Sequence, residues 1–155
     1  MRASLLAASA LAIVLHSATL SFASNFTLRD DISGDGFFNA FDWFTAPDPT
    51  NSFVKYVDVN TAKSNNMAYT DPATGRFVLK PGMERVTLAA VGRQSNRITS
   101  KKAMMDGVVI AKISHMPQGC GTWPAFWTTA RDSWPAQGEI DIVSVATWAL
   151  RCGEE

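Results

Sequence analysis

Two acidic residues near the C-terminal end of the chain, Glu139 and Asp141, alternate with Ile140 and Ile142. Side chains along a β-strand point alternately to its two faces, so the two carboxylates share one face and the two isoleucines share the other. The Cα atoms of the acidic residues are then about 6.6 Å apart, which is two strand rises. At this separation each charge influences the other. We interpret the pair as a functional site; a solvated strand face is the alternative.

Three tryptophans, Trp123, Trp127 and Trp134, lie within 16 residues of Glu139. Indole rings are well suited to stacking on ligands, and the C–H face of a sugar ring is one such ligand. Hydrolysis of a glycosidic bond needs one carboxylate that attacks the anomeric carbon or activates water, and another that protonates the leaving oxygen. Core packing remains the alternative for each tryptophan. Calcium binding is an alternative for the carboxylates, ranked lower because calcium needs more oxygen ligands than this run supplies.

The remaining polar candidates are few. His115 has no neighbouring histidine, and no Cys-x-x-Cys motif is present, so the sequence predicts neither a metal site nor a cofactor. We expect His115 to serve in packing, with a substrate contact as the alternative. Arg93 and Arg97 are considered for sugar hydroxyls and are not assigned to the site.

Short alternating segments predict an all-β protein, either a sandwich or a barrel. We expect strands within residues 53–59, 76–79, 86–91, 97–101, 107–114 and 122–128, and a last strand from Gly138. Of these, 107–114 has the clearest alternation. The aromatic-rich residues 37–44 are expected to form a loop that packs on the core, and the polar stretch 60–75 another loop.

The N-terminal end has the pattern of a secretory signal. Arg2 precedes an apolar run over residues 5–15, and Ser21-Phe22-Ala23 resembles a cleavage site, so residues 1–23 are predicted to be removed. The run is too short for a membrane span of about 20 residues, so no membrane association is expected after cleavage. Asn25-Phe26-Thr27 is a glycosylation sequon. The mature protein is therefore expected to be extracellular.

Composition and charge fit a single globular domain of this kind. The 155 residues include 14 basic and 14 acidic side chains, which leaves no basic excess for nucleic-acid binding. The two cysteines, Cys120 and Cys152, could pair in an oxidising compartment, although the sequence does not establish the bond.

Two longer segments carry a resemblance to a known family. Residues 121–127, Gly-Thr-Trp-Pro-Ala-Phe-Trp, and residues 134–142, Trp-Pro-Ala-Gln-Gly-Glu-Ile-Asp-Ile, resemble the active-site signature of glycoside hydrolase family 16. The likeness runs from about Leu28 to Val143 and is closest to the secreted fungal endo-1,3(4)-β-glucanases, or laminarinases. It implies a β-jelly roll of two bent antiparallel sheets, a β-glucan substrate, a monomer, no cofactor and a retaining mechanism.

The resemblance also implies roles within the family motif Glu-x-Asp-x-x-Glu. Its first Glu, the nucleophile, falls on Glu139, and its Asp, which supports the carboxylate pair, falls on Asp141. The second Glu, the general acid/base, falls on position 144, which is Ser144 here. Plain alternation would put residue 144 on the opposite face, so we expect a bulge with one extra residue. Trp134, Trp127 and Trp123 are the candidate substrate contacts, with core packing as the alternative, and a substrate contact is the second interpretation of His115.

The departure at Ser144 divides the chain into 24–143, an N-terminal portion of a family 16 domain, and 144–155, a tail without family likeness. Val143-Ser144 is what in-frame translation of a GTG-AGT splice donor would give, so we interpret the tail as translated intron sequence. An incomplete sandwich leaves strand edges unpaired and predicts poor independent stability. Two functions remain open: a truncated copy of an endo-β-glucanase that lacks its acid/base residue, and a non-catalytic β-glucan-binding protein.

Overall fold

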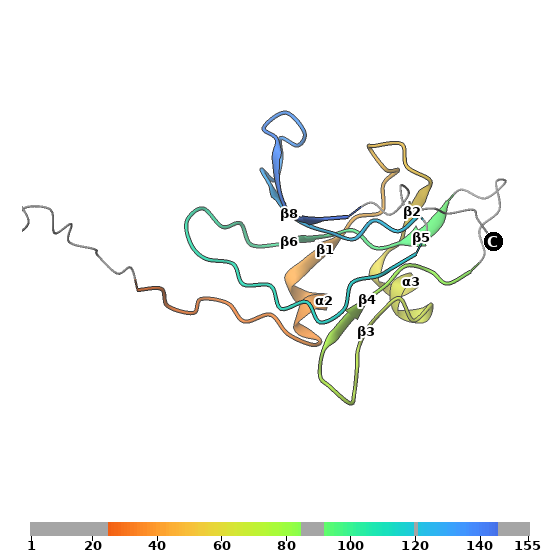
Figure 1. The fold of residues 1–155 in the computed structure, drawn as a ribbon, viewed down its shortest axis with the longest axis horizontal. Coiled ribbons are helices and arrows are strands. Elements are labelled where there is room, and N and C mark those ends of the chain that lie inside the picture. Colours follow the sequence, from red (N-terminus) through yellow and green to blue (C-terminus); the bar gives the residue numbers. More distant parts are fainter. Residues whose placement is uncertain (1–24, 85–91, 120, 146–155) are drawn as a thin grey trace, which may run out of the picture.

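The computed structural model describes residues 25–84, 92–119 and 121–145. Short strands dominate this part of the chain, together with two short helices (Figure 1). In chain order the elements are α2 (Gly36–Ala40), β1 (Phe41–Trp43), β2 (Val54–Tyr56), α3 (Val59–Ser64), β3 (Ala68–Thr70), β4 (Phe77–Leu79), β5 (Arg93–Ser95), β6 (Ile98–Ser100), β7 (Ala125–Thr129) and β8 (Glu139–Ser144). The described strands pair two by two: β1 with β6, β3 with β4 and β7 with β8 are antiparallel, and β2 with β5 is parallel.

The buried core of the described residues is small and surrounds α3. It consists of Val57, Ala62, Met67 and Ala68. Helix α3 begins where Asp58 accepts hydrogen bonds from the backbone N–H groups of Asn60, at 2.8 Å, and of the following threonine, at 3.1 Å. Such a cap satisfies donors that the first helical turn leaves free. The loop expected over residues 60–75 is therefore wrong: the capping aspartate starts a helix, and β3 follows it.

The aromatic-rich residues 37–44 also have regular structure where a loop was expected. Helix α2 leads directly into β1, and the rings of this segment pack on a phenylalanine from β4. Phe37 stacks on Phe77 with the ring centroids 4.5 Å apart, and Phe38 meets the same ring edge-on at 5.1 Å. Phe38, Trp43 and Phe77 all pack against the buried core. The expected packing role of the aromatic residues is confirmed.

Five of the expected strands are present as β2, β4, β6, β7 and β8, each within or overlapping its expected range. The expected strand at 107–114 is wrong, because the structure gives these residues no ladder partner and leaves them exposed and without regular structure. Alternation predicts which face a residue would take, but a strand also needs a neighbouring strand. Strands β3 and β5 were not predicted, since three residues carry too little pattern. The strand expected at 86–91 lies outside the described residues.

The last two strands form the best-developed antiparallel pair, which stands out from the rest of the chain in the view of Figure 1. Trp127 pairs with Asp141, whereas the preceding Phe126 pairs with Val143. One step along β7 therefore matches two steps along β8, and Ile142 is the extra residue of a β-bulge. The expected bulge is confirmed.

Candidate active site

The bulge decides which side chains of β8 share a face. Glu139 pairs with Thr129, Asp141 with Trp127 and Ser144 with Ala125. These three partners alternate along β7 and so lie on one face, which places Glu139, Asp141 and Ser144 on that face together. Ile140 pairs with Thr128 and lies on the other face. The structure thus brings the two predicted carboxylates and position 144 to one surface, and all three are exposed.

Glu139 is held by the tryptophan that precedes its strand. The indole Nε1–H of Trp134 donates a hydrogen bond to Oε2 of Glu139 at 2.5 Å. The turn between them closes at Gly138, whose φ of +73° lies in the left-handed region that favours glycine. The carbonyl oxygen of Gly138 accepts from the hydroxyl of Thr129 at 3.0 Å. One oxygen of the Glu139 carboxylate is thereby fixed in position, while the other is free of a protein hydrogen bond among the residues described.

The rings of Trp127 and Trp134 lie side by side next to this carboxylate, and Arg97 packs against both. The two indole centroids are 5.9 Å apart at an angle of 60°. The guanidinium carbon of Arg97 is 5.2 Å from each of them and 4.9 Å from the ring of Phe44. A planar guanidinium over several rings is a favourable cation–π arrangement. Arg97, which the sequence left unassigned, therefore belongs to the site; no signal in the sequence gives the ring partners of a single arginine.

Tyr56 and Asp48 extend the site beyond Arg97 and Phe44. The ring of Tyr56 meets that of Phe44 edge-on at 5.5 Å, and its hydroxyl donates to Asp48 at 3.4 Å. Partial burial, and then the charge of Asp48, raises the pKa of Tyr56, whereas the positive charge of Arg97 opposes that shift. The site thus extends from the β7–β8 hairpin to the ends of β1, β2 and β6.

A second arginine fastens the hairpin to the remainder of the structure. Nη2 of Arg131 donates to the backbone carbonyls of Ser100, at 2.5 Å, and Lys101. Arg93, the other arginine considered from the sequence, has a different role. It donates to the carbonyls of Gly82 and Glu84 at 2.8 and 2.7 Å and so ties β5 to the segment that follows β4.

The remaining predicted residues are more dispersed. Trp123 is exposed, and its Nε1–H donates to the hydroxyl of Ser144 at 3.1 Å, so it lies at the far end of the same hairpin. His115 is exposed in the irregular segment that follows β6, and no hydrogen bond or ring contact joins it to the hairpin within the described ranges. Asn25 is exposed at the start of the described chain. The signal residues 1–23, Cys120 and Cys152 lie outside the described residues.

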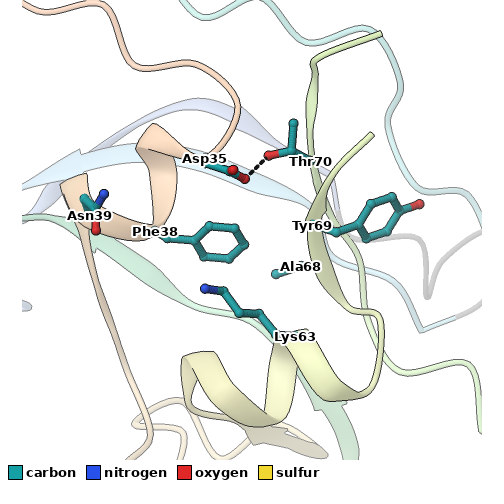
Figure 2. A pocket seen from close by; sticks show the side chains of 7 residues that line it. All are labelled: Asp35, Phe38, Asn39, Lys63, Ala68, Tyr69 and Thr70. Atoms are coloured by element: carbon teal, nitrogen blue, oxygen red, sulfur yellow. Dashed lines mark hydrogen bonds between the residues drawn. The ribbon is translucent and has the colours of Figure 1, made fainter. Parts of the chain in front are cut away.

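Of two open pockets formed by described residues, one touches the hairpin and the other does not. A pocket of about 360 Å³ lies beside Glu139 and includes Thr128, Thr129, Gln137 and Met104 among its lining residues. A pocket of about 440 Å³ lies between α2, α3 and β3 (Figure 2) and contains none of the predicted site residues. There Lys63 points at the ring of Phe38, with its Nζ 3.8 Å from the centroid.

Within the described part of the chain, no group of three or more His, Cys, Asp or Glu side chains is placed to hold a metal ion. The same residues include no helix with the length and apolar character needed to cross a membrane.

Comparison with known proteins agrees with this geometry. The family described as "XgeA-like, catalytic GH16 domain" matches residues 41–148, reaching five residues into the segment 144–155. An endo-1,3(4)-β-glucanase of Emericella nidulans is 42% identical over 123 residues, which are 78% of this chain and 19% of that protein. The endo-1,3(4)-β-glucanase of Arthroderma benhamiae is 40% identical over 78% of this chain and 26% of its own length.

Solved structures give the same result for the fold. A family 16 β-1,3-glucosyltransferase superposes with a TM-score of 0.74 at 40% identity, covering 79% of this chain and 41% of that one. Laminarinase 16A from Phanerochaete chrysosporium, solved with 6-O-glucosyl-laminaritriose in its donor and acceptor sites, superposes with a TM-score of 0.70 at 38% identity over 77% of this chain and 40% of its own. The chain spans about two fifths of these solved relatives and a fifth to a quarter of the curated ones. The expected all-β jelly-roll class is confirmed, and the chain belongs to glycoside hydrolase family 16.

Proposed function

We propose that this chain is the N-terminal portion of a secreted endo-1,3(4)-β-glucanase. Such an enzyme cleaves internal bonds of β-glucans with retention of the anomeric configuration. The single observation that carries the proposal is the bulge at Ile142, which gathers Glu139, Asp141 and position 144 on one exposed face. A retaining glycosidase needs this kind of grouping, because its nucleophile and its acid/base must both face the sugar. The relatives are named endo-1,3(4)-β-glucanases, which supports β-1,3- and mixed β-1,3/1,4-glucans as the substrate class.

In this proposal Glu139 is the nucleophile. The Trp134 indole holds one carboxylate oxygen, which leaves the other to attack the anomeric carbon and form a glycosyl-enzyme ester. Asp141, on the same face, supports the Glu139 carboxylate through its charge. The Trp134 ring, next to Glu139, offers a stacking face for a sugar ring, and the tilted ring of Trp127 lies beside it. Trp123, at the other end of the hairpin, and His115 are further substrate contacts.

Ser144 limits what this chain does by itself. A serine hydroxyl is too weak an acid to protonate a sugar leaving group near neutral pH, and general acid catalysis contributes roughly 10²- to 10⁴-fold. The chain is therefore proposed to lack laminarin hydrolysis while retaining the nucleophile. An activated substrate tests this, because a dinitrophenolate leaving group departs without protonation.

The test mixes the purified chain with a 2,4-dinitrophenyl β-laminarioligosaccharide and follows phenolate release. The expected result is a burst of about one equivalent that mass spectrometry assigns to an ester on Glu139. Glu139→Gln abolishes the burst, and Asp106→Asn, a change of an exposed carboxylate in the irregular segment after β6, leaves it unchanged. A burst that persists in Glu139→Gln refutes the assignment.

The second candidate function is a non-catalytic β-glucan-binding protein, which Ser144 favours. Laminarin binding by the chain, with no phenolate burst, would support it. Long-read transcript sequencing addresses the origin of the tail: transcripts that continue after Val143 with family sequence and a Glu at the acid/base position support the hydrolase, and their protein should release reducing sugar from laminarin. Transcripts that keep the tail as the main form contradict the intron interpretation.

We also propose that the protein is secreted after cleavage behind Ala23 and is glycosylated at Asn25, which is exposed. The support is the signal pattern and the sequon in the sequence. N-terminal sequencing of protein from culture medium should begin at Ser24, and Asn25→Gln should lower the mass by one glycan. We further propose a monomer.

A further inference from the structure

The pocket between α2, α3 and β3 lies apart from the candidate active site and has the size of a ligand pocket. Its volume is about 440 Å³, within the range of roughly 300–1,000 Å³ that small-molecule sites occupy. None of its described lining residues comes from the β7–β8 hairpin, so it is separate from the pocket beside Glu139. Figure 2 shows the side chains that line it.

The buried core fixes the walls of this pocket. Phe38, on α2, meets the ring of Phe77 edge-on at 5.1 Å and packs against the core. Ala68, on β3, is 1% exposed. The hydroxyl of Thr70 donates to Oδ1 of Asp35 at 2.5 Å and so ties β3 to the residue before α2 (Figure 2). A ligand therefore meets a preformed pocket, which lowers the entropic cost of binding.

Three exposed polar side chains line the pocket together with the ring of Phe38: those of Asp35, Asn39 and Lys63. The Nζ of Lys63 lies 3.8 Å from the centroid of the ring. Within the described residues, the side chains of Asn39 and Lys63 make no hydrogen bond, and Asp35 uses one carboxylate oxygen. An ammonium donates, an amide donates and accepts, and a carboxylate oxygen accepts. Donors and acceptors are both available to a ligand.

This combination favours a neutral sugar over a charged or a purely apolar ligand. Lys63 and Asp35 carry opposite charges, so the pocket does not select an anion or a cation by net charge. An apolar ligand would remove three polar side chains from water without giving them partners. The hydroxyls of a pyranose donate and accept, and its C–H face packs on an aromatic ring. A cation–π contact is weak at an exposed site, so a sugar can displace the Lys63 ammonium from the face of Phe38.

We propose that this pocket is a second, non-catalytic binding site for a β-glucan chain. A sugar ring lies on Phe38, and Asn39, Lys63 and Asp35 bind its hydroxyls. Asp35 is the one carboxylate among the described lining residues, so the pocket lacks the pair that hydrolysis needs. A site of this kind retains the polysaccharide without cleaving it. The choice of a β-glucan rests on the proposed function, whereas the pocket and its sugar-binding groups do not.

The test titrates the full 155-residue chain with laminarihexaose and follows the backbone amides by NMR. We expect shift changes over residues 36–40, 59–64 and 68–70, which form the walls of the pocket. Maltohexaose, an α-linked glucan of the same length, should bind there at least fivefold more weakly. The amides of residues 139–144 report separately on binding at the carboxylate face.

Matched substitutions locate the site. Lys63→Met and Asn39→Ala change exposed side chains and should each weaken binding at the pocket at least fivefold, with any shifts over residues 139–144 unchanged. Lys55→Met removes an exposed lysine of β2 that does not line the pocket, and it should leave the affinity within twofold. Unchanged exchange protection at Met67 in each variant shows that the core is intact.

Four results overturn the proposal: no shifts at the pocket amides, equal affinity for maltohexaose, full binding in both Lys63→Met and Asn39→Ala, or equal weakening by Lys55→Met. Binding at the pocket without a glycosyl-enzyme counts only against the proposed catalysis. A glycosyl-enzyme without shifts at the pocket counts only against this second site.

Discussion

Arg97 is the side chain whose loss should most directly loosen the β7–β8 hairpin. Its guanidinium lies 4.9 Å from the ring of Phe44 and 5.2 Å from those of Trp127 and Trp134. Each cation–π contact contributes about 0.5–1 kcal/mol at a partly exposed site, so three contribute roughly 1.5–3 kcal/mol. Arg97→Met keeps an unbranched, flexible side chain and removes the cation.

The free energy of local opening of the β7–β8 hairpin should fall by the same amount. An isolated two-stranded hairpin is marginally stable in water, so a hairpin that detaches from the remaining structure frays. A loss of about 1.5–3 kcal/mol corresponds to a roughly 10- to 150-fold larger open population, because 1.4 kcal/mol is a factor of ten. Amide hydrogen exchange over residues 139–144, compared between wild type and Arg97→Met, measures it directly.

The control is Arg76→Met, which removes an exposed arginine on the loop before β4. It should leave exchange over 139–144 unchanged. The reasoning is refuted if Arg97→Met changes those rates by less than twofold, or if Arg76→Met changes them as much.

Three further predictions concern the frame that carries the hairpin. Gly92→Ala should unpair β2 from β5, because φ at Gly92 is +104° and an added Cβ would lie 2.5 Å from the backbone nitrogen of Val54; the exchange protection of both strands should be lost. Met67→Ala should lower the free energy of the opening that exposes the most strongly protected amides by about 2–5 kcal/mol. Met67 is 1% exposed and is the largest fully buried side chain described. The hydrogen bonds from the hydroxyl and backbone N–H of Thr61 hold the pKa of Asp58 below its usual value. The stabilisation of α3 by this charge is therefore present above pH of about 3.9, the unfolded value, and is lost as pH falls through the lower folded pKa; NMR amide shifts of α3 should titrate there, and in Asp58→Asn they should not.

Each of these has a matched control. Gly36→Ala adds a Cβ that meets no atom within 4 Å, so the strand pairing should survive it. Met83→Ala alters a side chain that is 81% exposed and should change the free energy by less than about 0.5 kcal/mol. A titration of α3 amides that persists in Asp58→Asn would assign the pH dependence to another group.

Much of the candidate site could be read from local sequence. Alternation predicted that Glu139 and Asp141 share a face, and the motif spacing predicted one extra residue before position 144; the register of β8 on β7 confirms both. The shared face was predictable because a strand's side-chain period of two is a local property of the backbone, and the extra residue was implied by the resemblance to the family motif. The all-β class followed from the same periodicity applied to several segments.

Other elements depended on contacts with distant residues, which no local sequence pattern predicts. Residues 107–114 have the clearest strand alternation in the chain and form no strand, because a ladder requires a second strand. Helix α3 was missed because Asp58 begins it within a polar stretch, and its stability comes from the cap and from burying Ala62.

The tertiary structure alone decided how the site is assembled. The sequence by itself determined the chemical groups, their order along the strand and the family, since these depend on residue identity and short-range spacing. Only the folded chain placed Arg97 against Trp127 and Trp134 and set the Trp134 indole on Glu139. Contacts between distant residues depend on how the elements pack, and one arginine or one indole has many rings and carboxylates with which it could pair.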